Sequence, residues 1–412
     1  MRILSFSTFL MLLTAGAPAQ PPAIASTKVA LYAAVGSELT TYRVDVASAN
    51  LFKQGSVTLP QNVQEAWPHP SRRYLYVAWS NNVPGAEGRH GVTAFRIDPA
   101  TGALEPHGQP ISVPARSVFI TVDPPGNYLA AASNEPSGAT VYRIAADGTL
   151  GVSVPQPNDL DFGIYAHQVR IDPSSRMVMI IARGNGPTAT KREDPGALKV
   201  FGYKDGVLSN RASIAPGGGY NFQPRHLEFH PSRPFAFITL ERQNKLQVYK
   251  ILDGPTLSPA PLFTKETLVD PSRLAAQATS SIHAHPNGRF LYLGNRSSGT
   301  VEFQGKQVLG PGENSIAVYS IDQQTGEPAL IQNADTHGVH PRTFAIDPTG
   351  QTLVVANMQQ VLVRENDHVR PLAATLSVFR IAKDGKLAFV RKYDQDTSGG
   401  RNLFWTGMVG LR

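Results

Sequence analysis

The 412-residue sequence contains no cysteine, which excludes both a disulfide framework and a metal site built on thiolates. It also lacks long segments of helical periodicity, a G-x-S-x-G nucleophile motif and any clear cluster of metal-binding carboxylates. The formal charge is +7, but Lys and Arg are scattered and form no basic stripe of the kind that nucleic-acid binders carry. We therefore expect no nucleic-acid partner, no metal, no cofactor and no acyl-enzyme on a serine.

The one long apolar run lies at the N-terminus. Met1-Arg2 is followed by "ILSFSTFLMLLTAGA" and then by Ala17-Pro18-Ala19. A short positive region, an apolar stretch and an A-x-A site are typical of a secretory signal peptide, and an uncleaved anchor is the alternative. We expect a signal peptide at 1–19, a short linker at 20–27 and one domain at 28–412. The mature protein would then be periplasmic or secreted, free of the membrane and monomeric.

A repeat of a tight turn followed by an apolar strand organises the rest of the chain. Its six copies are "HPSRRYLYVAWS", "DPPGNYLAAASN", "DPSSRMVMIIAR", "HPSRPFAFITLE", "HPNGRFLYLGNR" and "DPTGQTLVVANM". A second alternating strand follows each copy, as in "GVTAFRIDPATGAL" and "LSVFRIAKDGKL". The turns recur about every 50–60 residues, a spacing that suits four-stranded propeller blades. The sequence predicts an all-β propeller.

A seventh blade is split between the two ends of the chain. Residues 29–46 provide a second and a third strand but no first, and "NLFWTGMVGL" near the C-terminus is a spare strand. If that strand supplies the missing innermost position, the ring closes and leaves no open sheet edge. We therefore predict a seven-bladed β-propeller of four-stranded blades, closed by the C-terminal strand joining the N-terminal blade.

The stretch "PRHLEFHPSRPFAFITLE" places an arginine and a glutamate at one end of a hairpin. Arg225 stands six residues before Pro231 and Glu241 stands ten after it, so antiparallel pairing brings both to the rim with the long loops. The same two positions in the other repeats add further polar residues to this rim. They include His167, Arg183, Arg296, Arg342 and Asn134. Such a gathering of charge at one channel mouth indicates a binding or catalytic site, with inter-blade ion pairs as the alternative.

Several histidines admit plainer interpretations. His226 follows Arg225 and is expected to point toward a neighbouring blade, although we include it among the candidate substrate-binding residues. His230 and His285 belong to the turns on the opposite rim and are expected to be structural. His283 lies within a first strand and is expected to be a hydrogen-bonded core residue.

At this level of detail the sequence resembles the lactonase seven-bladed β-propellers. That family includes 6-phosphogluconolactonases and fungal 3-carboxy-cis,cis-muconate lactonizing enzymes. The resemblance covers nearly the whole mature chain and is carried by "PRHLEFHP", "AHQVRIDP", "HPNGRFLYLGNR" and "HPRTFAIDPTG". It implies that the catalytic and binding set comprises His167, Arg225, Glu241 and Arg296. The Glu after Asn134 and the enlarged loops after Arg183, Arg296 and Met358 depart from the family pattern, so the substrate does not transfer.

These residue types suit the hydrolysis of a lactone, which needs a base, a positioned water and groups that stabilise an oxyanion. Glu241 and His167 are the two candidates for the base, and Arg225 is the candidate electrostatic stabiliser. Arg296, Arg342 and Arg183 are expected to hold substrate oxygens through their planar guanidinium groups. The predicted partner is a small lactone or anionic hydroxy acid. A lactonizing cycloisomerase acting on a dicarboxylate and a non-enzymatic periplasmic binding propeller are the alternatives.

Overall fold

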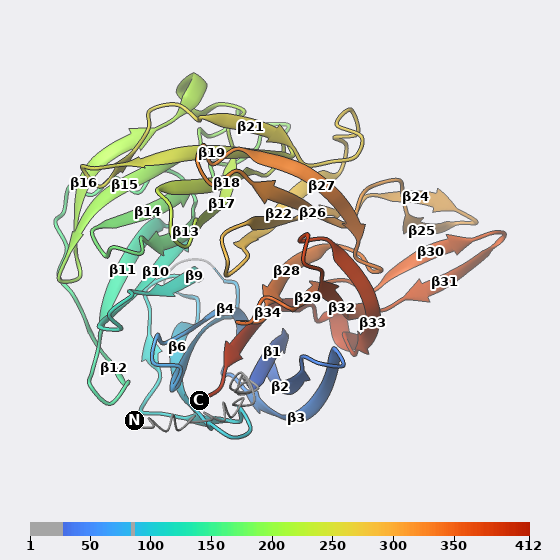
Figure 1. Ribbon diagram of the computed structural model, residues 1–412, viewed down its shortest axis with the longest axis horizontal. Coiled ribbons are helices and arrows are strands. Elements are labelled where there is room, and N and C mark those ends of the chain that lie inside the picture. Colours follow the sequence, from blue (N-terminus) through green and yellow to red (C-terminus); the bar gives the residue numbers. More distant parts are fainter. Residues whose placement is uncertain (1–27, 84–86) are drawn as a thin grey trace, which may run out of the picture.

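Seven antiparallel sheets form a ring in the computed structural model, which describes residues 28–83 and 87–412 (Figure 1). Five of the sheets have four strands, and in the other two the outermost position is divided between two short strands. The predicted signal peptide at 1–19 and the predicted linker at 20–27 both lie outside the described residues. Blade 1 consists of β34 (Leu403–Gly410), β1 (Val29–Val35), β2 (Glu38–Asp45) and β3 (Asn50–Thr58). The C-terminal strand thus occupies the innermost position beside the N-terminal strands, and the predicted closure of the ring is confirmed.

The other six blades follow one another along the chain. Blade 2 has β4 (Asn62–Pro68), β5 (Tyr74–Ser80), β6 (His90–Ile97), β7 (Leu104–Pro106) and β8 (Ile111–Ser112). Blade 3 has β9 (Ser117–Val122), β10 (Tyr128–Asn134), β11 (Ser137–Ile144) and β12 (Leu150–Ser153). Blade 4 has β13 (Ala166–Ile171), β14 (Met177–Ala182), β15 (Ala197–Lys204) and β16 (Val207–Ile214). Blade 5 has β17 (Pro224–Phe229), β18 (Phe235–Leu240), β19 (Lys245–Leu252), β20 (Thr256–Leu257) and β21 (Phe263–Glu266).

Blades 6 and 7 each carry an extra hairpin between their second and third strands. Blade 6 has β22 (Gln277–Ala284), β23 (Phe290–Ser297), β26 (Ser315–Ile321) and β27 (Pro328–Asp335), with the hairpin β24 (Thr300–Phe303) and β25 (Lys306–Leu309). Blade 7 has β28 (Pro341–Ile346), β29 (Thr352–Asn357), β32 (Ala374–Ile381) and β33 (Leu387–Gln395), with the hairpin β30 (Val361–Glu365) and β31 (His368–Leu372). The two hairpins project together from the ring, and we call them the wing (Figure 1). Two short 3₁₀ turns lie at Pro216–Gly219 and Ser398–Gly400.

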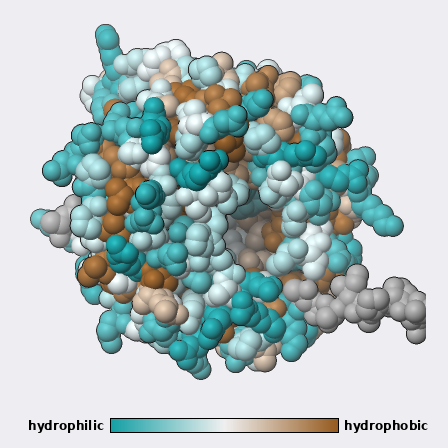
Figure 2. All heavy atoms as spheres, turned by 60° about the vertical axis from the view of Figure 1, so that its left-hand side comes forward, coloured by the Kyte–Doolittle hydropathy of each residue, from teal (hydrophilic) through white to brown (hydrophobic). Residues whose placement is uncertain are grey.

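Packing between neighbouring blades forms the core. The second strands β5, β14, β18 and β29 are buried along their whole length, because both of their faces are covered by adjacent blades. One apolar cluster joins Leu31 of β1 to Val354 and Leu376 of blade 7, directly across the closure. The outermost strands are largely exposed, and the view in Figure 2 accordingly shows mostly hydrophilic residues with scattered hydrophobic patches.

Three turn histidines each connect their blade to the next one. Nε2 of His69, His230 and His285 lies 2.9 Å from the carbonyl oxygen of a glycine in the following blade's turn, Gly126, Gly288 and Gly350 respectively. The glycines have φ values of 82°, 71° and 71°, which residues with a Cβ rarely adopt. The structural role expected of His230 and His285 is therefore confirmed.

A β-bulge interrupts the innermost strand of every blade where it enters the loop-rich rim. In blade 4, Ala166 pairs with Ala182 and Gln168 with Ile181, so His167 between them has no partner residue. The same irregularity occurs in the other six blades. A bulge redirects the extra side chain. Seven extra residues or pairs therefore collect at one mouth of the channel.

Candidate active site

The bulged residues and the ends of the second strands together form a pocket of about 150 Å³ at this mouth. His167, Arg225, Arg342, Val118 and Phe404 come from bulges, whereas Arg183, Glu241 and Arg296 come from the ends of second strands. Arg116 and Tyr165, each two residues before a bulge, complete the lining. The pocket thus contains six of the seven predicted site residues. The seventh, His226, does not line it.

Glu241 is the one carboxylate in this lining and is buried among guanidinium groups. Its Oε1 lies 2.9 Å from Nε of Arg225 and also accepts from Nη2 of Arg296, and its Oε2 lies 3.4 Å from Nη1 of Arg183. Burial alone would raise the pKa of Glu241, but the surrounding guanidinium groups hold that pKa below its usual value. The carboxylate is therefore ionised and both of its oxygens are engaged.

The guanidinium groups outnumber the carboxylate five to one. Burial and then the neighbouring Arg296 lower the pKa of Arg225 well below its ordinary value, and the same two causes lower the pKa of Arg342 to about 9. Aromatic rings fix two of these groups, because Arg183 lies 3.9 Å above Tyr165 and Arg342 lies 3.7 Å above Phe404. Burial is the larger cause of both lowered pKa values, and the second cause, a neighbouring guanidinium, reflects the crowding of positive charge in the pocket. An anion entering it relieves that repulsion.

Two histidines near the arginines of this pocket, His167 and His340, are uncharged. Burial, followed by the charge of Arg225, lowers the pKa of His167 well below its usual value. Burial and Arg296 lower the pKa of His340 to about 2, and Nη1 of Arg296 donates to Nε2 of His340 at 3.1 Å. Within the described chain, Nδ1 of His167 is buried without a hydrogen-bond partner. His167 is therefore a neutral imidazole with an uncommitted nitrogen.

His226 lies beneath the pocket rather than in it. Its ring is 5.0 Å from that of His167, and Nη1 of Arg225 lies 3.4 Å from its Nε2. Arg225 and His226 form a two-residue bulge, and the latter side chain faces a cavity of about 300 Å³ deeper in the channel. The structure therefore places His226 away from a ligand in the pocket and next to the charged groups that surround one.

A second buried carboxyl, Glu65, faces that deeper cavity. Burial raises the pKa of Glu65 to about 8, although the indole nitrogen of Trp405 donates to the carboxyl.

The pKa of a third buried carboxyl group, that of Glu228, is lowered instead. Glu228 pairs with Arg170 at 2.7 Å and lies 3.3 Å from Nδ1 of His283. Burial would raise its pKa, but the charge of Arg170 and the contact with His283 outweigh burial and bring the pKa to about 2. His283 is thus hydrogen-bonded, as expected, but lines the channel cavity.

The sequence reasoning missed Arg116, Tyr165, His340 and Phe404. Phe404 occupies in the C-terminal strand the position that Arg225 occupies in β17, so extending the repeat alignment to the tail would have found it. Arg116 and Tyr165 precede the aligned positions by two residues in segments that show no repeat. His340 is held by backbone contacts outside the repeat, where its N–H donates to Oδ1 of Asn314 at 2.9 Å.

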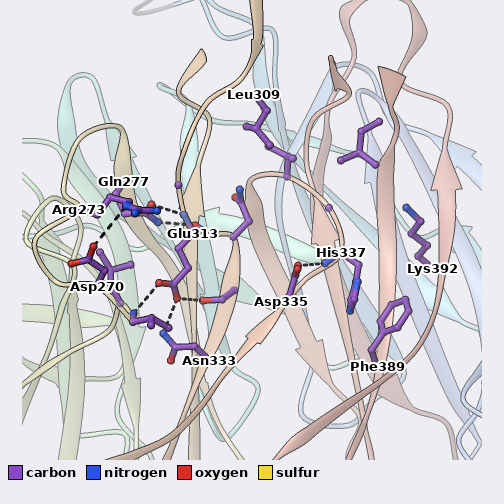
Figure 3. Close-up of a pocket in the computed structure, with 18 of the residues that line it drawn as sticks. Asp270, Arg273, Gln277, Leu309, Glu313, Asn333, Asp335, His337, Phe389 and Lys392 are labelled. Atoms are coloured by element: carbon purple, nitrogen blue, oxygen red, sulfur yellow. Dashed lines mark hydrogen bonds and ion pairs between the residues drawn. The ribbon is translucent and has the colours of Figure 1, made fainter. Parts of the chain in front are cut away.

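A larger cavity of about 800 Å³ lies between blades 6 and 7 beside the wing (Figure 3). Its carboxylates are engaged within the protein. Glu313 accepts from Asn333 at 2.7 Å, Ser315 at 2.5 Å and the N–H of Val269 at 2.9 Å, and Asp335 caps the N–H of His337 at 2.7 Å. Several buried side-chain nitrogens without hydrogen-bond partners in the described part of the chain converge instead on the pocket at the channel mouth, namely Nδ1 of His167 and Nε of Arg296 and Arg342. We therefore place the candidate site in the smaller pocket despite its volume.

Two further observations concern cofactors and membranes. In the part of the chain that the structure describes, no three His, Asp or Glu side chains gather closely enough to hold a metal ion. No helix within residues 28–83 and 87–412 is long and apolar enough to cross a membrane.

A closed propeller with an arginine-lined pocket at one channel mouth suits a small anion, or an ester whose reaction develops an oxyanion. A family model described as "Lactonase, 7-bladed beta-propeller" matches residues 26–367. The chain therefore belongs to the lactonase seven-bladed β-propeller family and is an enzyme of the lactonase type, a carboxylic-ester hydrolase.

Named relatives agree with this assignment. The 6-phosphogluconolactonase of Bacillus subtilis is 28% identical over 292 residues, which cover 68% of this chain and 76% of the relative. That of Pectobacterium carotovorum is 28% identical over 319 residues, covering 76% and 82%. Among solved structures, a periplasmic gluconolactonase of Pseudomonas aeruginosa has a TM-score of 0.68 at 19% identity, covering 94% of this chain and all of that one. At this identity the structural likeness establishes the fold.

Proposed function

We propose that the protein hydrolyses a small sugar-derived lactone to its hydroxy acid in the pocket at the channel mouth. The observation that carries the proposal is the excess of five guanidinium groups over one carboxylate around an uncharged imidazole. Hydrolysis of a lactone generates a tetrahedral oxyanion and then a carboxylate, and buried guanidinium groups stabilise both. The names of the relatives, 6-phosphogluconolactonase and gluconolactonase, support lactone hydrolysis.

The contacts of Glu241 suggest that it positions the arginines rather than accepting a proton. Arg225, Arg296 and Arg183 occupy both of its oxygens, and its lowered pKa makes it a weak base. His167 lines the same pocket, and its buried Nδ1 has no hydrogen-bond partner within the described chain. A developing oxyanion would offset the guanidinium charges that depress the pKa of this imidazole, so its basicity would rise during the reaction.

The proposed reaction runs through one tetrahedral intermediate. Water attacks the lactone carbonyl carbon while His167 takes its proton, and the guanidinium of Arg225 stabilises the oxyanion. The bond from the carbonyl carbon to the ring oxygen then breaks, and His167 returns the proton to the leaving alkoxide. The product acid ionises to a carboxylate beside Arg296 and Arg342 and releases one proton to solvent.

We also propose that the protein is exported, with cleavage near Ala19. Phosphosugars are chiefly cytosolic, so an exported enzyme would act on an unphosphorylated lactone. N-terminal sequencing of the protein recovered from a periplasmic or secreted fraction should give a chain that begins near Gln20. A full-length cytosolic product would contradict this part of the proposal.

The activity is tested by proton release from a panel of aldonolactones, using an indicator in weak buffer. We expect turnover above the spontaneous rate for at least one lactone. His167→Asn should then lower kcat by about 10²–10⁴-fold, the usual contribution of a general base. Because the pKa of His167 is far below 6.5, wild-type kcat/KM should show no inflection near pH 6.5.

A matched pair of arginine substitutions provides the control. Arg225→Lys replaces a planar fork in the pocket by a point charge and should lower kcat/KM severely. Arg233→Lys changes an exposed arginine at the opposite end of the same hairpin and should leave the rate unchanged. Equal activity of both variants, or no turnover of any lactone, would overturn the proposed function.

A further inference from the structure

A groove of about 550 Å³ adjoins the catalytic pocket between blades 3 and 4. Tyr165 lines both spaces, so the groove begins where the pocket ends. The pocket alone, at about 150 Å³, is smaller than the roughly 300–1,000 Å³ of ordinary ligand sites, whereas pocket and groove together fall within that range. A ligand that filled both would place one end among the arginines and the other beyond Tyr165.

A chain of polar contacts connects the groove to Glu241. Arg183, which pairs with Glu241, donates from Nη2 to Oδ1 of Asn185 at 3.4 Å. Nδ2 of Asn185 donates in turn to Oδ2 of Asp194 at 3.0 Å, and Nζ of Lys191 reaches the same oxygen at 2.7 Å. These contacts fix the wall formed by the long loop after β14. The groove wall is therefore positioned by the same residues that order the pocket.

The opposite wall carries an amide without a partner. Asn134 is only 5% exposed, yet no hydrogen bond of its side chain occurs within the described chain, and its Oδ1 is buried. Asn134 stands at the end of the second strand of blade 3. Arg183 and Glu241 occupy the equivalent positions at the ends of the second strands of blades 4 and 5. A buried polar group left unpaired is costly unless a ligand or water pairs with it.

The charges of the groove disfavour a second anionic group as its occupant. Lys191 is already paired with Asp194, and Glu135 adds a further negative charge, so a phosphate or carboxylate there would meet no free cation of the groove lining. The amide of Asn134 and the carboxylates suit hydroxyl groups, which both donate and accept hydrogen bonds. The arginine-rich pocket and the acidic groove thus fit the two ends of one molecule, an ester carbonyl and a neutral polyhydroxyl group.

We propose that the groove binds a glycosyl group, so that the preferred substrate is the lactone of an aldonic acid carrying a second sugar ring. This inference rests on the proposed lactonase activity of the adjoining pocket. The lactone ring occupies the pocket beneath Arg183, and the second ring lies between Asn134 and Asp194. The wall residues act by binding the substrate's extension and take no part in the bond cleavage.

The test compares glucono-1,5-lactone with lactobiono-1,5-lactone, which carries a galactosyl group on its gluconolactone ring. We expect wild-type kcat/KM to be at least about tenfold higher for the disaccharide lactone. Asn134→Ala should lower the ratio of the two kcat/KM values roughly 3–10-fold, the usual effect of one lost hydrogen bond. Ile164→Trp, which adds bulk at the groove rim, should lower the ratio further. Val152→Trp, an equal addition at a 77% exposed site on the outer strand β12, should leave the ratio at its wild-type value.

Calorimetry with the two hydrolysed acids separates this inference from the proposed activity. If neither lactone is turned over but lactobionate binds more tightly than gluconate, and Asn134→Ala abolishes the difference, the groove assignment stands and the catalytic proposal fails. If gluconolactone is hydrolysed as fast as its galactosyl derivative, or if the ratio is the same in all variants, the groove assignment is wrong. Equal binding of the two acids also overturns it.

Discussion

At the scale of single residues, Glu241 illustrates how a buried charge is retained. Burial favours its protonated form, but Arg225, Arg296, Arg183 and Arg342 together favour the carboxylate more strongly. Removing the negative charge would leave Arg225, which is 2% exposed, among other cations with no counter-charge. A buried pair broken on one side typically costs about 3–5 kcal/mol.

Glu241→Gln should therefore lower the melting temperature and the activity together. Sulfate, which can occupy the vacated negative position, should restore part of the melting temperature by binding only the folded state. The control is Glu327→Gln, which removes an exposed partner of Lys265 and should change the melting temperature little. A Glu241→Gln protein that melts like the wild type, with or without sulfate, would contradict this account.

Glu65 should make stability depend on pH in the direction opposite to that of Glu241. Its pKa is about 8 in the folded protein and near 4.5 when unfolded, so the folded state holds a proton that the unfolded state loses first. The contribution of Glu65 to the free energy of unfolding is therefore greatest below pH 4.5, and it decreases as the pH rises toward 8. For Glu241, whose pKa is lowered, stability is present above about pH 4.5 and falls below it.

Denaturant unfolding of the wild type and of Glu65→Gln at pH 5 and pH 8 measures the first effect. The wild type should lose more free energy of unfolding between the two pH values than the variant, which cannot titrate at this position. The same loss in both proteins would show that Glu65 does not hold its proton in the folded state.

At the scale of structural elements, the wing is an addition to a ring that is continuous without it. β23 pairs with β26 and β29 with β32 in unbroken register on either side of the inserted hairpins. The two hairpins contact each other, with Nε2 of Gln304 donating to the carbonyl of Asp367 at 3.1 Å and Arg364 lying 4.1 Å above Phe303. Each hairpin thus covers part of the other.

Replacing residues 300–309 and 361–372 together by short Gly-Ser linkers should leave the propeller folded. The replacement spares Glu313 and Asn314, which hold neighbouring backbone in place. We expect the melting temperature to fall by only a few degrees and lactone turnover to persist, because loops of this kind contribute little to the stability of the ring. Removing one hairpin alone should reduce solubility more than removing both. Unfolding of the double replacement would show that the wing is part of the core.

At the scale of the whole molecule, β34 is both the closing strand and a wall of the site. It pairs with β1 from Val29↔Gly410 to Val35↔Leu403, and Oγ1 of Thr406 donates to the carbonyl of Tyr32 at 2.9 Å. Phe404 in the same strand stacks on Arg342. One element therefore links closure of the ring to the order of the pocket.

Ending the chain at Arg401 should open the ring and abolish cooperative unfolding, because β1 would be left with a bare edge. We expect aggregation or a large loss of near-ultraviolet circular dichroism. Adding residues 402–412 as a separate peptide should restore part of both signals. A truncated protein with the melting temperature of the full chain would contradict closure by this strand.

The sequence by itself determined the blades, their number and the closure, because each rests on local turn chemistry repeated at a regular interval. Strand pairing within a hairpin also fixed that Arg225 and Glu241 share a rim. The bulges were decided only by the tertiary structure, because one extra residue or pair in an inner strand is defined by its pairing with the second strand and has no signature in the repeat. They turn His167 and Arg342 into the pocket and His226 toward the deeper cavity. Alternation along the strand already indicated that His226 points away from Arg225, but it did not show what His226 faces. Tyr165, with a φ of 61°, lines the pocket from a connection that shows no repeat, so the repeat alignment could not place it.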